Sequence, residues 1–414
     1  MAFLYTVLIF FISKLFSLAA LFNPKAKLFV EGRRGLIKKI QEDFKTNSQP
    51  VIWIHCASLG EFEQGRPLME IIKREFPSYK IVLTFFSPSG YEVRKNYSHA
   101  DFVYYLPWDT KGNASAFVAA VRPVLAVFVK YEFWFHYANE LQKRSIPTLS
   151  IASIFRPQQL FFKSYGGFYR GILKKFSYFF VQNYASADLL KSIGITTVAV
   201  AGDTRFDRVV EIASKAEDIP LAEAFKNDEK VFVIGSAWPE DMEVLAPFIN
   251  EHGQHLKFII APHEINEASL IAVEKSLQRK YIRFSKADES TIGEACVLII
   301  DNMGMLSRLY KYGEFAYVGG AFGKGLHNIL EAACYGTPIF FGDKNFEKFQ
   351  EAKDLINRGG AFDVGDYSEL LNKYEMITAP ENFLLACEVT KSYVQENLGA
   401  TEKIMSYCRT FLKS

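Results

Sequence analysis

The chain has 414 residues, of which 49% are hydrophobic, and its formal net charge is +2. This length exceeds what one hydrophobic core usually supports, so two domains are expected, and the near-neutral charge argues against a whole-molecule attraction to nucleic acid. The five cysteines form no CxxC pair, which gives no indication of a zinc cluster and favours a reducing cytoplasm.

The N-terminal segment, residues 1–22, is apolar except for four residues, Thr6, Ser13, Lys14 and Ser17. It is close to the roughly 20 residues that span a bilayer, and it lacks the charge pattern and cleavage site of a signal peptide. The following stretch, 23–50, is basic, so the positive-inside rule places the body of the protein in the cytoplasm. We therefore predict a membrane anchor helix at 1–22 and a basic linker at 23–50. Lys14 leaves an interfacial helix open as the alternative to a span.

The next segment, residues 51–207, alternates short apolar runs with helical patterns, and this spacing predicts a parallel, doubly wound sheet. The expected strands are 51–55, 80–86, 102–106, 124–130, 147–153, 179–182 and 198–200. Glu61 lies at a helix start directly after the first strand, where open α/β sheets bind ligands. A carboxylate there can act as a base, or it can simply stabilise the helix N-terminus.

A second alternation begins after a charged stretch, 208–228, which we predict to be a linker to a second domain at 229–414. Its expected strands include 231–234, 258–261 and 297–300. Each of these strands ends in a turn, and the turns can converge on a single crevice. The tail from residue 380 onward has a helical pattern, and its last helix is a candidate to cross back to the first domain.

Residues 317–342 read as a strand, a glycine-rich turn, a helix and a second strand. The glycines let the backbone approach a ligand, and we expect His327 and Asn328 to open a helix whose free N–H groups favour a phosphate. Glu331 follows Asn328 by three residues, so both would face that helix end. An ordinary βαβ turn is the alternative, because such turns alone are weak evidence for a nucleotide.

A series of motifs gives this pattern a family likeness. They are ASLGEF at 57–62, YEFW at 131–134, GDTRFD at 202–207, GSAWPED at 235–241, IIAPHE at 259–264, DNMGMLSRLY at 301–310, YVGGAFGKGLHNILEAA at 317–333 and PIFFG at 338–342. In this order, over nearly the whole length, the chain resembles the 3-deoxy-D-manno-oct-2-ulosonic acid (Kdo) transferases of lipopolysaccharide synthesis. These are inverting glycosyltransferases of the GT-B fold. The resemblance implies two Rossmann-like domains facing a cleft, with an N-terminal membrane helix.

The resemblance also implies a function and a set of site residues. The reaction would move Kdo from CMP-Kdo to a lipid A precursor (lipid IVA) at the cytoplasmic side of the inner membrane, without a metal, another cofactor or nucleic acid. Glu61 would be the general base, and Glu132 and Arg205 would stabilise the transition state. The CMP of the donor would be bound by the residues matching the family's donor motifs: Pro262, His263, Met303, Gly304, Met305, Asn328, Ile329, Leu330 and Glu331.

Some positions depart from the family pattern, and other functions stay open. His263 stands where arginine is commoner and Lys130 where an acidic residue is usual, which leaves the acceptor details undecided. Another GT-B enzyme that uses a UDP-sugar and an inert membrane-attached scaffold are the alternatives. A nicotinamide-dependent oxidoreductase is disfavoured, because CASLGEF rather than GxGxxG follows the first strand.

Overall fold

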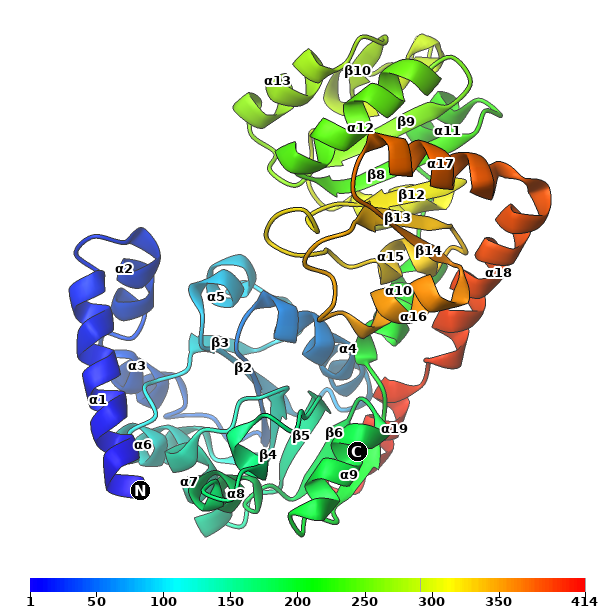
Figure 1. Cartoon of the computed structure of the whole chain (residues 1–414). Coiled ribbons are helices and arrows are strands. Elements are labelled where there is room, and N and C mark those ends of the chain that lie inside the picture. Colours follow the sequence, from blue (N-terminus) through cyan, green and yellow to red (C-terminus); the bar gives the residue numbers. More distant parts are fainter. Residues whose placement is uncertain (291, 414) are drawn as a thin grey trace. The chain divides into compact units, whose positions relative to one another are not determined.

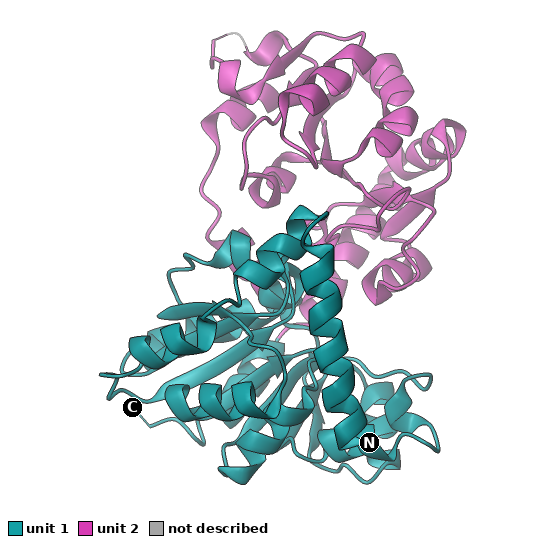
Figure 2. Cartoon of the chain, turned by 90° about the vertical axis from the view of Figure 1, so that its left-hand side faces the viewer, with its two compact units in different colours: residues 1–207, 399–414 teal, residues 208–398 magenta. Residues whose placement is uncertain are grey.

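The computed structural model describes residues 1–290 and 292–413 (Figure 1). The chain divides into two compact units (Figure 2). Unit 1 comprises Met1–Asp207 together with Gly399–Ser414, and unit 2 comprises Arg208–Leu398. Each unit is built on a seven-stranded sheet, and every strand pair in both sheets is parallel. The prediction of two parallel α/β domains is therefore confirmed.

The sheet of unit 1 has the strand order β3-β2-β1-β4-β5-β6-β7. Its strands are β1 Val51–Cys56, β2 Lys80–Phe85, β3 Phe102–Tyr105, β4 Pro123–Val129, β5 Thr148–Ser153, β6 Tyr178–Val181 and β7 Val198–Val200. Its helices after β1 are α4 Leu59–Glu75, α5 Pro88–Arg94, α6 Lys111–Val121, α7 Phe135–Lys143, η1 Leu160–Phe162, α8 Gly167–Leu173, α9 Tyr184–Ser192 and α19 Ala400–Cys408. The strand order reverses between β1 and β4, which is where open α/β sheets bind ligands.

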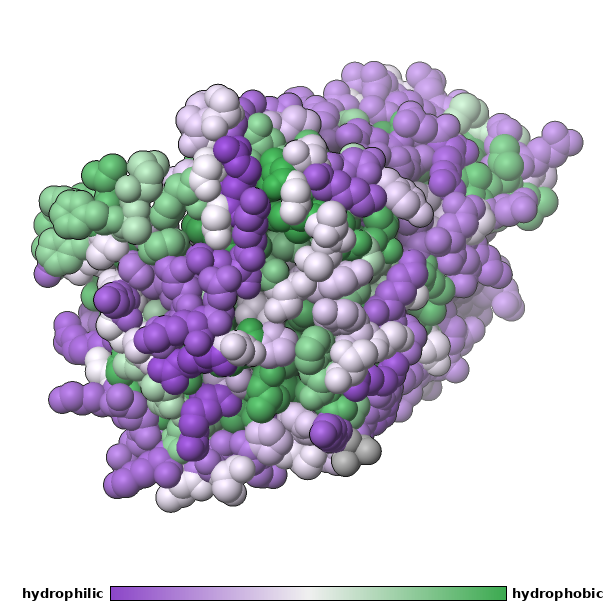
Figure 3. Space-filling view, turned by 90° about the horizontal axis from the view of Figure 1, so that it is seen from below, coloured by the Kyte–Doolittle hydropathy of each residue, from purple (hydrophilic) through white to green (hydrophobic). Residues whose placement is uncertain are grey.

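The N-terminal helix α1, Ala2–Ala19, lies against unit 1 along one face only. It has the length and composition to cross a membrane, and only 6% of it is buried. The Tyr5 hydroxyl donates to Asp109 Oδ2 at 2.6 Å, and Ile9 is buried. Hydrophobic atoms protrude at the left edge of Figure 3. The large apolar side chains that the other face of α1 exposes are Phe3, Leu4, Leu8, Phe10, Phe11, Leu15 and Leu18.

The segment expected as a basic linker, 23–50, carries two helices, α2 Pro24–Glu31 and α3 Leu36–Asp43. Asn23 caps α2 by accepting from two backbone N–H groups, and Gly35 adopts a left-handed φ of 67° before α3. Ile40 and Phe44 are buried in the core of the unit. Basic side chains fill the outer face of these helices, which is why composition alone suggested a linker.

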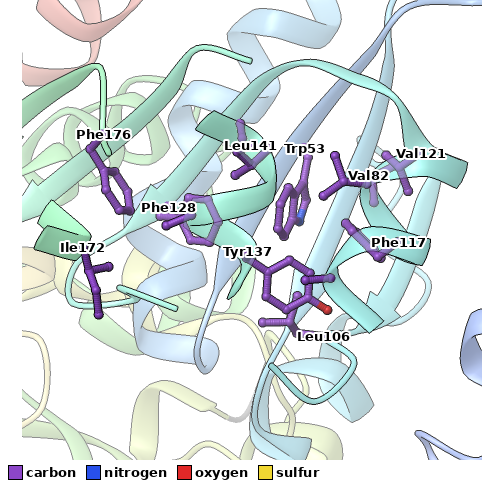
Figure 4. Close-up of a cluster of buried hydrophobic side chains, with 14 of the residues drawn as sticks. Trp53, Val82, Leu106, Phe117, Val121, Phe128, Tyr137, Leu141, Ile172 and Phe176 are labelled. Atoms are coloured by element: carbon purple, nitrogen blue, oxygen red, sulfur yellow. The ribbon is translucent and has the colours of Figure 1, made fainter. Parts of the chain in front are cut away.

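The core of unit 1 has two layers, because alternate side chains of each strand point to opposite faces of the sheet. In β1, Val51 and Trp53 belong to one layer, whereas Ile52, Ile54 and Cys56 belong to the other. Figure 4 shows Trp53 in the first layer beside aromatic side chains from β4 and α7. Helix α19 packs on the second layer through Ile404, Met405 and Cys408, so the end of the chain completes unit 1.

The sheet of unit 2 has the strand order β10-β11-β9-β8-β12-β13-β14, and its order reverses between β8 and β12. Its strands are β8 Val231–Ala237, β9 Lys257–Pro262, β10 Tyr281–Arg283, β11 Val297–Ile299, β12 Phe315–Val318, β13 Ile339–Gly342 and β14 Ala361–Val364. Its helices include α11 Pro220–Lys226, α12 Pro239–His252, α13 Glu267–Ser276, α14 Leu306–Leu309, α15 Leu330–Ala333, α16 Gln350–Arg358, α17 Tyr367–Thr378 and α18 Pro380–Glu396, with short helices η2 Phe284–Lys286, η3 Ile292–Glu294 and η4 Tyr310–Tyr312.

The charged stretch 208–228, expected as a linker, is also largely helical. It holds most of α10, Thr204–Ser214, which begins in unit 1, and the whole of α11. Helix α11 belongs to unit 2, where Phe225 is buried and its carbonyl accepts a hydrogen bond from Lys257 Nζ at 2.6 Å. Charged residues on the outer side of both helices gave this stretch its loop-like composition.

Candidate functional site

Glu61 lies at the carboxyl end of β1, in the first turn of α4. Its Oε2 accepts a hydrogen bond from the backbone N–H of Ser58 at 3.1 Å and another from the Ser58 hydroxyl. Its Oε1 lies 3.9 Å from Lys130 Nζ, and the side chain is 19% exposed. One oxygen therefore fixes the helix start, and the other faces the end of the sheet.

Glu132 follows β4, the strand on the other side of the reversal point. Its Oε2 accepts from Trp134 Nε1 at 2.8 Å and lies 3.1 Å from His55 Nε2, and its side chain is 15% exposed. Burial and then the charges of Glu61 and Glu132 raise the pKa of the Cys56 thiol well above its usual value. Both carboxylates therefore lie around the last residue of β1.

Arg205 follows β7 at the start of α10, and Asp203 holds its side chain. Arg205 donates from Nε at 3.0 Å and from Nη2 at 2.8 Å to Asp203 Oδ2. Burial by itself would raise the pKa of Asp203, but the guanidinium and the hydrogen bonds outweigh burial and hold that pKa below its usual value. Gln64 Nε2 donates to Asp203 at 3.0 Å, and Thr204 Oγ1 donates to the Gln64 carbonyl at 2.6 Å. Helix α4, which carries Glu61, therefore also anchors the loop of Arg205.

The reversal point of unit 2 is organised around the buried carboxylate of Asp241 in the first turn of α12. It accepts from the backbone N–H groups of Trp238 and Gly320 and from the Tyr317 hydroxyl, each at 2.9 Å. A Cβ on Gly319 would lie 2.5 Å from Asp241 Oδ2, and Gly320 has a φ of 97°. Both positions therefore require glycine, and Asp241 joins the start of α12 to the glycine-rich turn.

Three aromatic rings lie together beside that turn. Trp238 stacks on His263 with ring centroids 4.1 Å apart, and its Nε1 donates to His327 Nε2 at 3.0 Å. Lys324 Nζ lies 4.2 Å from the centroid of the Trp238 ring. Burial, with a smaller effect of His263, lowers the pKa of His327 to about 4, and burial also lowers the pKa of His263. Both imidazoles are therefore neutral at pH 7.

The residues expected to bind CMP lie at the ends of three strands of this sheet, two on one side of β8 and one on the other. Pro262 ends β9 and His263 follows it, 303–305 follow β11, and 328–331 follow β12. The expected helix does not open at His327 and Asn328, because α15 begins at Leu330 and has one turn. Asn328 instead accepts from the backbone N–H of Leu330 at 3.3 Å and donates to Glu331 Oε1 at 3.2 Å. The helix therefore begins two residues later than expected, at Leu330.

A cavity of about 710 Å³ lies beside the aromatic rings, between α12 and α13. Trp238, Pro262 and Lys324 contribute to its lining, together with both apolar and polar residues of the two helices, such as Met242 and Glu243. Among residues 1–290 and 292–413, no group of three or more His, Cys, Asp or Glu side chains is placed to hold a metal ion.

Sequence reasoning did not single out His55, Asp203 or Asp241 as individual site residues. Each is a buried polar side chain with a hydrogen-bond partner at the expected site. His55 lies against Glu132, Asp203 accepts from Arg205, and Asp241 accepts from Gly320 of the glycine-rich turn. His55 lies two residues before ASLGEF, Asp203 is the second residue of GDTRFD, and Asp241 ends GSAWPED. A polar residue inside an otherwise apolar strand or at a strand end was the available signal, since such a group needs a partner when buried.

Comparison with known proteins shows which families the chain is similar to. Residues 30–208 match the family model described as 3-Deoxy-D-manno-octulosonic-acid transferase (kdotransferase). The chain is 29% identical over 336 residues to a 3-deoxy-D-manno-octulosonic acid transferase of Aquifex aeolicus, covering 79% of this chain and 86% of that protein. It is 25% identical over 376 residues to the enzyme of the same name from Rickettsia bellii, covering 89% of each. A bifunctional glycosyltransferase/methyltransferase of Fusobacterium nucleatum is 26% identical over 391 residues, and the chain spans 59% of its length.

Solved structures match the fold. The UDP-GlcNAc 2-epimerase of Neisseria meningitidis gives a TM-score of 0.61 at 14% identity, covering 87% of this chain and all of that one. MurG of Acinetobacter baumannii gives a TM-score of 0.54 at 11% identity, covering 87% and 99%. At these identities the likeness shows the fold alone, which is the GT-B type with two parallel-sheet domains.

Proposed function

Because the chain belongs to the 3-deoxy-D-manno-octulosonic acid (Kdo) transferases, glycosyltransferases of the GT-B type, we propose that it moves Kdo from CMP-Kdo to a lipid A precursor, lipid IVA, in lipopolysaccharide biosynthesis. The observation that carries the proposal is the pair of carboxylates, Glu61 and Glu132, at the reversal point of the unit 1 sheet. An inverting glycosyl transfer needs a base to take the proton of the acceptor hydroxyl, and a second carboxylate can offset positive charge on the sugar.

Glu61 is the general base of this mechanism. Its Oε2 is occupied by Ser58, so Oε1 takes the proton from the acceptor hydroxyl. The hydroxyl oxygen then bonds to the anomeric carbon of Kdo, and the bond from that carbon to the phosphate oxygen breaks. CMP leaves with the electron pair, and the configuration at the anomeric carbon is inverted.

Glu132 and Arg205 stabilise the two charges that develop in the transition state. The sugar ring gains oxocarbenium character, which the Glu132 carboxylate offsets. The leaving phosphate and the Kdo carboxylate are negative, and the Arg205 guanidinium is a planar donor of the kind that binds such groups. Asp203 keeps that guanidinium in one orientation.

The turns of unit 2 bind the donor in this proposal. Main-chain N–H groups of 303–305 and 328–331 meet the phosphate and cytosine, and the Glu331 carboxylate accepts from ribose hydroxyls. His263 contributes a neutral imidazole where a permanent cation would bind phosphate more strongly, and Lys324 supplies a nearby ammonium over Trp238. No metal and no other cofactor takes part.

We place the protein at the cytoplasmic surface of the inner membrane. The exposed face of α1 carries the apolar side chains of a membrane-binding helix, and its opposite face is fixed to unit 1 by Tyr5 and by Thr6, whose Oγ1 lies 2.9 Å from His136 Nε2. A helix held along one side by a folded domain suits the membrane interface better than a span, because its polar contacts stay in water-accessible protein.

Incubation of the purified full-length protein with CMP-Kdo and lipid IVA in mixed micelles tests the proposal. We expect CMP release and a lipid product heavier by one or more Kdo residues in mass spectrometry. A parallel incubation with UDP-N-acetylglucosamine should give no product. Transfer from the UDP-sugar instead would identify another GT-B activity, and absence of both products would support an inert scaffold; either result would contradict the proposal.

A further inference from the structure

His55 is the one imidazole in the buried β1 strand, and the proposed mechanism gives it no part. It is fully buried, and it lies directly opposite Thr84 of β2 in the parallel register. Trp53 lies two residues earlier in β1 and therefore points to the same face of the sheet. Figure 4 shows Leu141, Val82 and Tyr137 beside Trp53. Three side chains with polar groups thus meet inside an apolar layer, where each needs a partner.

The hydrogen bonds among these residues form one continuous chain. Trp53 Nε1 donates to Thr84 Oγ1 at 2.8 Å, and that oxygen lies 2.8 Å from His55 Nδ1. On the other side of the ring, His55 Nε2 lies 3.1 Å from Glu132 Oε2.

The Glu132 carboxylate fixes one proton of the ring, because an ionised carboxylate can only accept a hydrogen bond. His55 Nε2 therefore carries a proton that points at Glu132 Oε2; without it, a bare nitrogen lone pair would face a carboxylate oxygen at 3.1 Å. On the other side of the ring, Nδ1 faces the Thr84 hydroxyl at 2.8 Å and the Thr84 carbonyl oxygen at 3.1 Å. The hydroxyl can donate or accept and the carbonyl can only accept, so Thr84 holds the ring in place with Nδ1 either bare or protonated.

The same oxygen of Glu132 also accepts from Trp134 Nε1 at 2.8 Å. Two N–H donors therefore hold Oε2. Within residues 1–290 and 292–413, no hydrogen bond involves Oε1, which is the oxygen left for the reacting sugar. The two donors keep the side chain of Glu132 in one orientation at the edge of the site.

We propose that His55 is a positioning residue for the transfer reaction, with a proton on Nε2. It donates to Glu132 and so aims the second oxygen of that carboxylate, while Thr84 holds the other side of the ring. The inference rests on the proposed function, since it acts through Glu132.

Nitrogen-15 NMR of the histidine side chains in the full-length protein tests the position of this proton. The His55 signals are identified by their absence in His55→Gln. We expect a protonated Nε2 at neutral pH. An unprotonated Nε2 in the wild-type ring would overturn the proposal.

Steady-state kinetics tests the role. His55→Leu should lower kcat by about tenfold to hundredfold, as losses of outer hydrogen-bond partners do, with little change in KM for CMP-Kdo. His55→Gln, whose amide N–H₂ can reach the same oxygen, should retain most of kcat. Thr148→Val is the matched control, because Thr148 is a buried polar residue of β5 whose hydroxyl bonds only the Ile146 carbonyl among the described residues. An equal kcat for His55→Leu and the control would refute the role.

A double-mutant cycle separates this role from general stability. His55→Leu should cost little more when Glu132 is already Gln, because it acts through that carboxylate. Full additivity of the two losses contradicts the inference. If the wild-type protein does not transfer Kdo, the proposed function and the role of His55 fall together. If it does, and only the His55 results disagree, the proposed function stands without this residue.

Discussion

The Glu61 carboxylate accepts the backbone N–H of Ser58 at 3.1 Å through one oxygen and leaves the other 3.9 Å from Lys130 Nζ. A single side chain thus serves as part of a helix cap and presents an acceptor atom at the end of the sheet. These two uses have different energetic sizes. A cap contributes about 1 kcal/mol to stability, whereas general base catalysis contributes about 10²-fold to 10⁴-fold in rate.

Substitution of Glu61 should therefore separate the two uses. Glu61→Gln keeps an oxygen that can accept from Ser58 but cannot take a proton, so we expect kcat to fall by about 10²-fold or more. The free energy of unfolding should change by less than about 1 kcal/mol. CMP release and urea denaturation measure the two effects. Glu63→Gln is the control, because Glu63 is on the same helix but pairs with Arg94 at 3.0 Å. Wild-type kcat in Glu61→Gln would remove this residue from the mechanism.

The loop of Arg205 gives a second prediction. Arg205→Lys keeps the charge but loses the planar contact of Nε and Nη2 with Asp203, so kcat should fall by about tenfold or more. Asp203→Asn should do the same and should also lower the free energy of unfolding by about 3 to 5 kcal/mol, because it leaves a partly buried guanidinium without its carboxylate. Kinetics and chemical denaturation distinguish the two variants.

The control for this prediction is Arg144→Lys, which alters an arginine paired with Glu140 at 2.8 Å on α7, away from the site. Its kcat should match the wild type. If Arg205→Lys behaves like this control, the planar geometry of the guanidinium is not needed for the reaction. Its positive charge would then be the only property of Arg205 that the reaction could use.

Much of this architecture could be predicted from the sequence, and the predictions that failed did so for physical reasons. The alternation of apolar runs placed the strands of the first sheet and the five central strands of the second, because buried parallel strands leave a continuous apolar signal. The two edge strands of the second sheet, β10 and β14, were missed because they are short and only partly buried. The helices of 23–50 were missed because basic side chains hid a narrow apolar stripe that includes Ile40 and Phe44. The helix expected at His327 does not form, because Asn328 turns its side chain back to the Leu330 N–H.

The roles of Asp203, Asp241 and His55 could not be read from spacing. Each depends on a partner more than 25 residues away in the chain, such as Gln64 for Asp203 and Gly320 for Asp241. Local patterns carry no information on such pairs until the sheet brings them together. The resemblance supplied the residues expected to contact substrates, and the fold supplied those that hold them in place.

The buried ring of His327 predicts a loss of stability in mild acid. Its pKa in the folded protein is about 4, below the value of about 6.5 expected in the unfolded chain. Between these values the unfolded chain binds a proton that the folded protein does not, so stability is complete above pH 6.5 and is lost as pH falls toward 4. Hydrogen exchange of the β8 and α12 peptides, measured at pH values across this window and corrected for intrinsic rates, should report this opening.

His327→Gln removes the titrating group and should flatten the dependence of that exchange on pH. His255→Gln alters an exposed histidine of the same unit and should leave the wild-type dependence unchanged. Equal slopes in His327→Gln and the wild type would show that another group, such as His263, is responsible.

The two faces of α1 predict opposite effects of substitution. Leu8 and Phe11 are exposed, and burial of a large apolar side chain contributes about 1.5 to 3 kcal/mol. The double variant Leu8→Asn and Phe11→Asn should therefore bind anionic phospholipid vesicles at least about tenfold more weakly, with an unchanged melting temperature. Tyr5→Phe removes the hydroxyl that donates to Asp109 and should instead speed hydrogen exchange in α1 while vesicle binding is largely kept.

A thiol introduced by Phe3→Cys should react only with reagents added to the side that carries the folded units, since a helix fixed along Tyr5 and Ile9 lies at the interface. Labelling from the opposite side of sealed vesicles would show that the helix spans the bilayer and that its contacts with unit 1 break in the membrane.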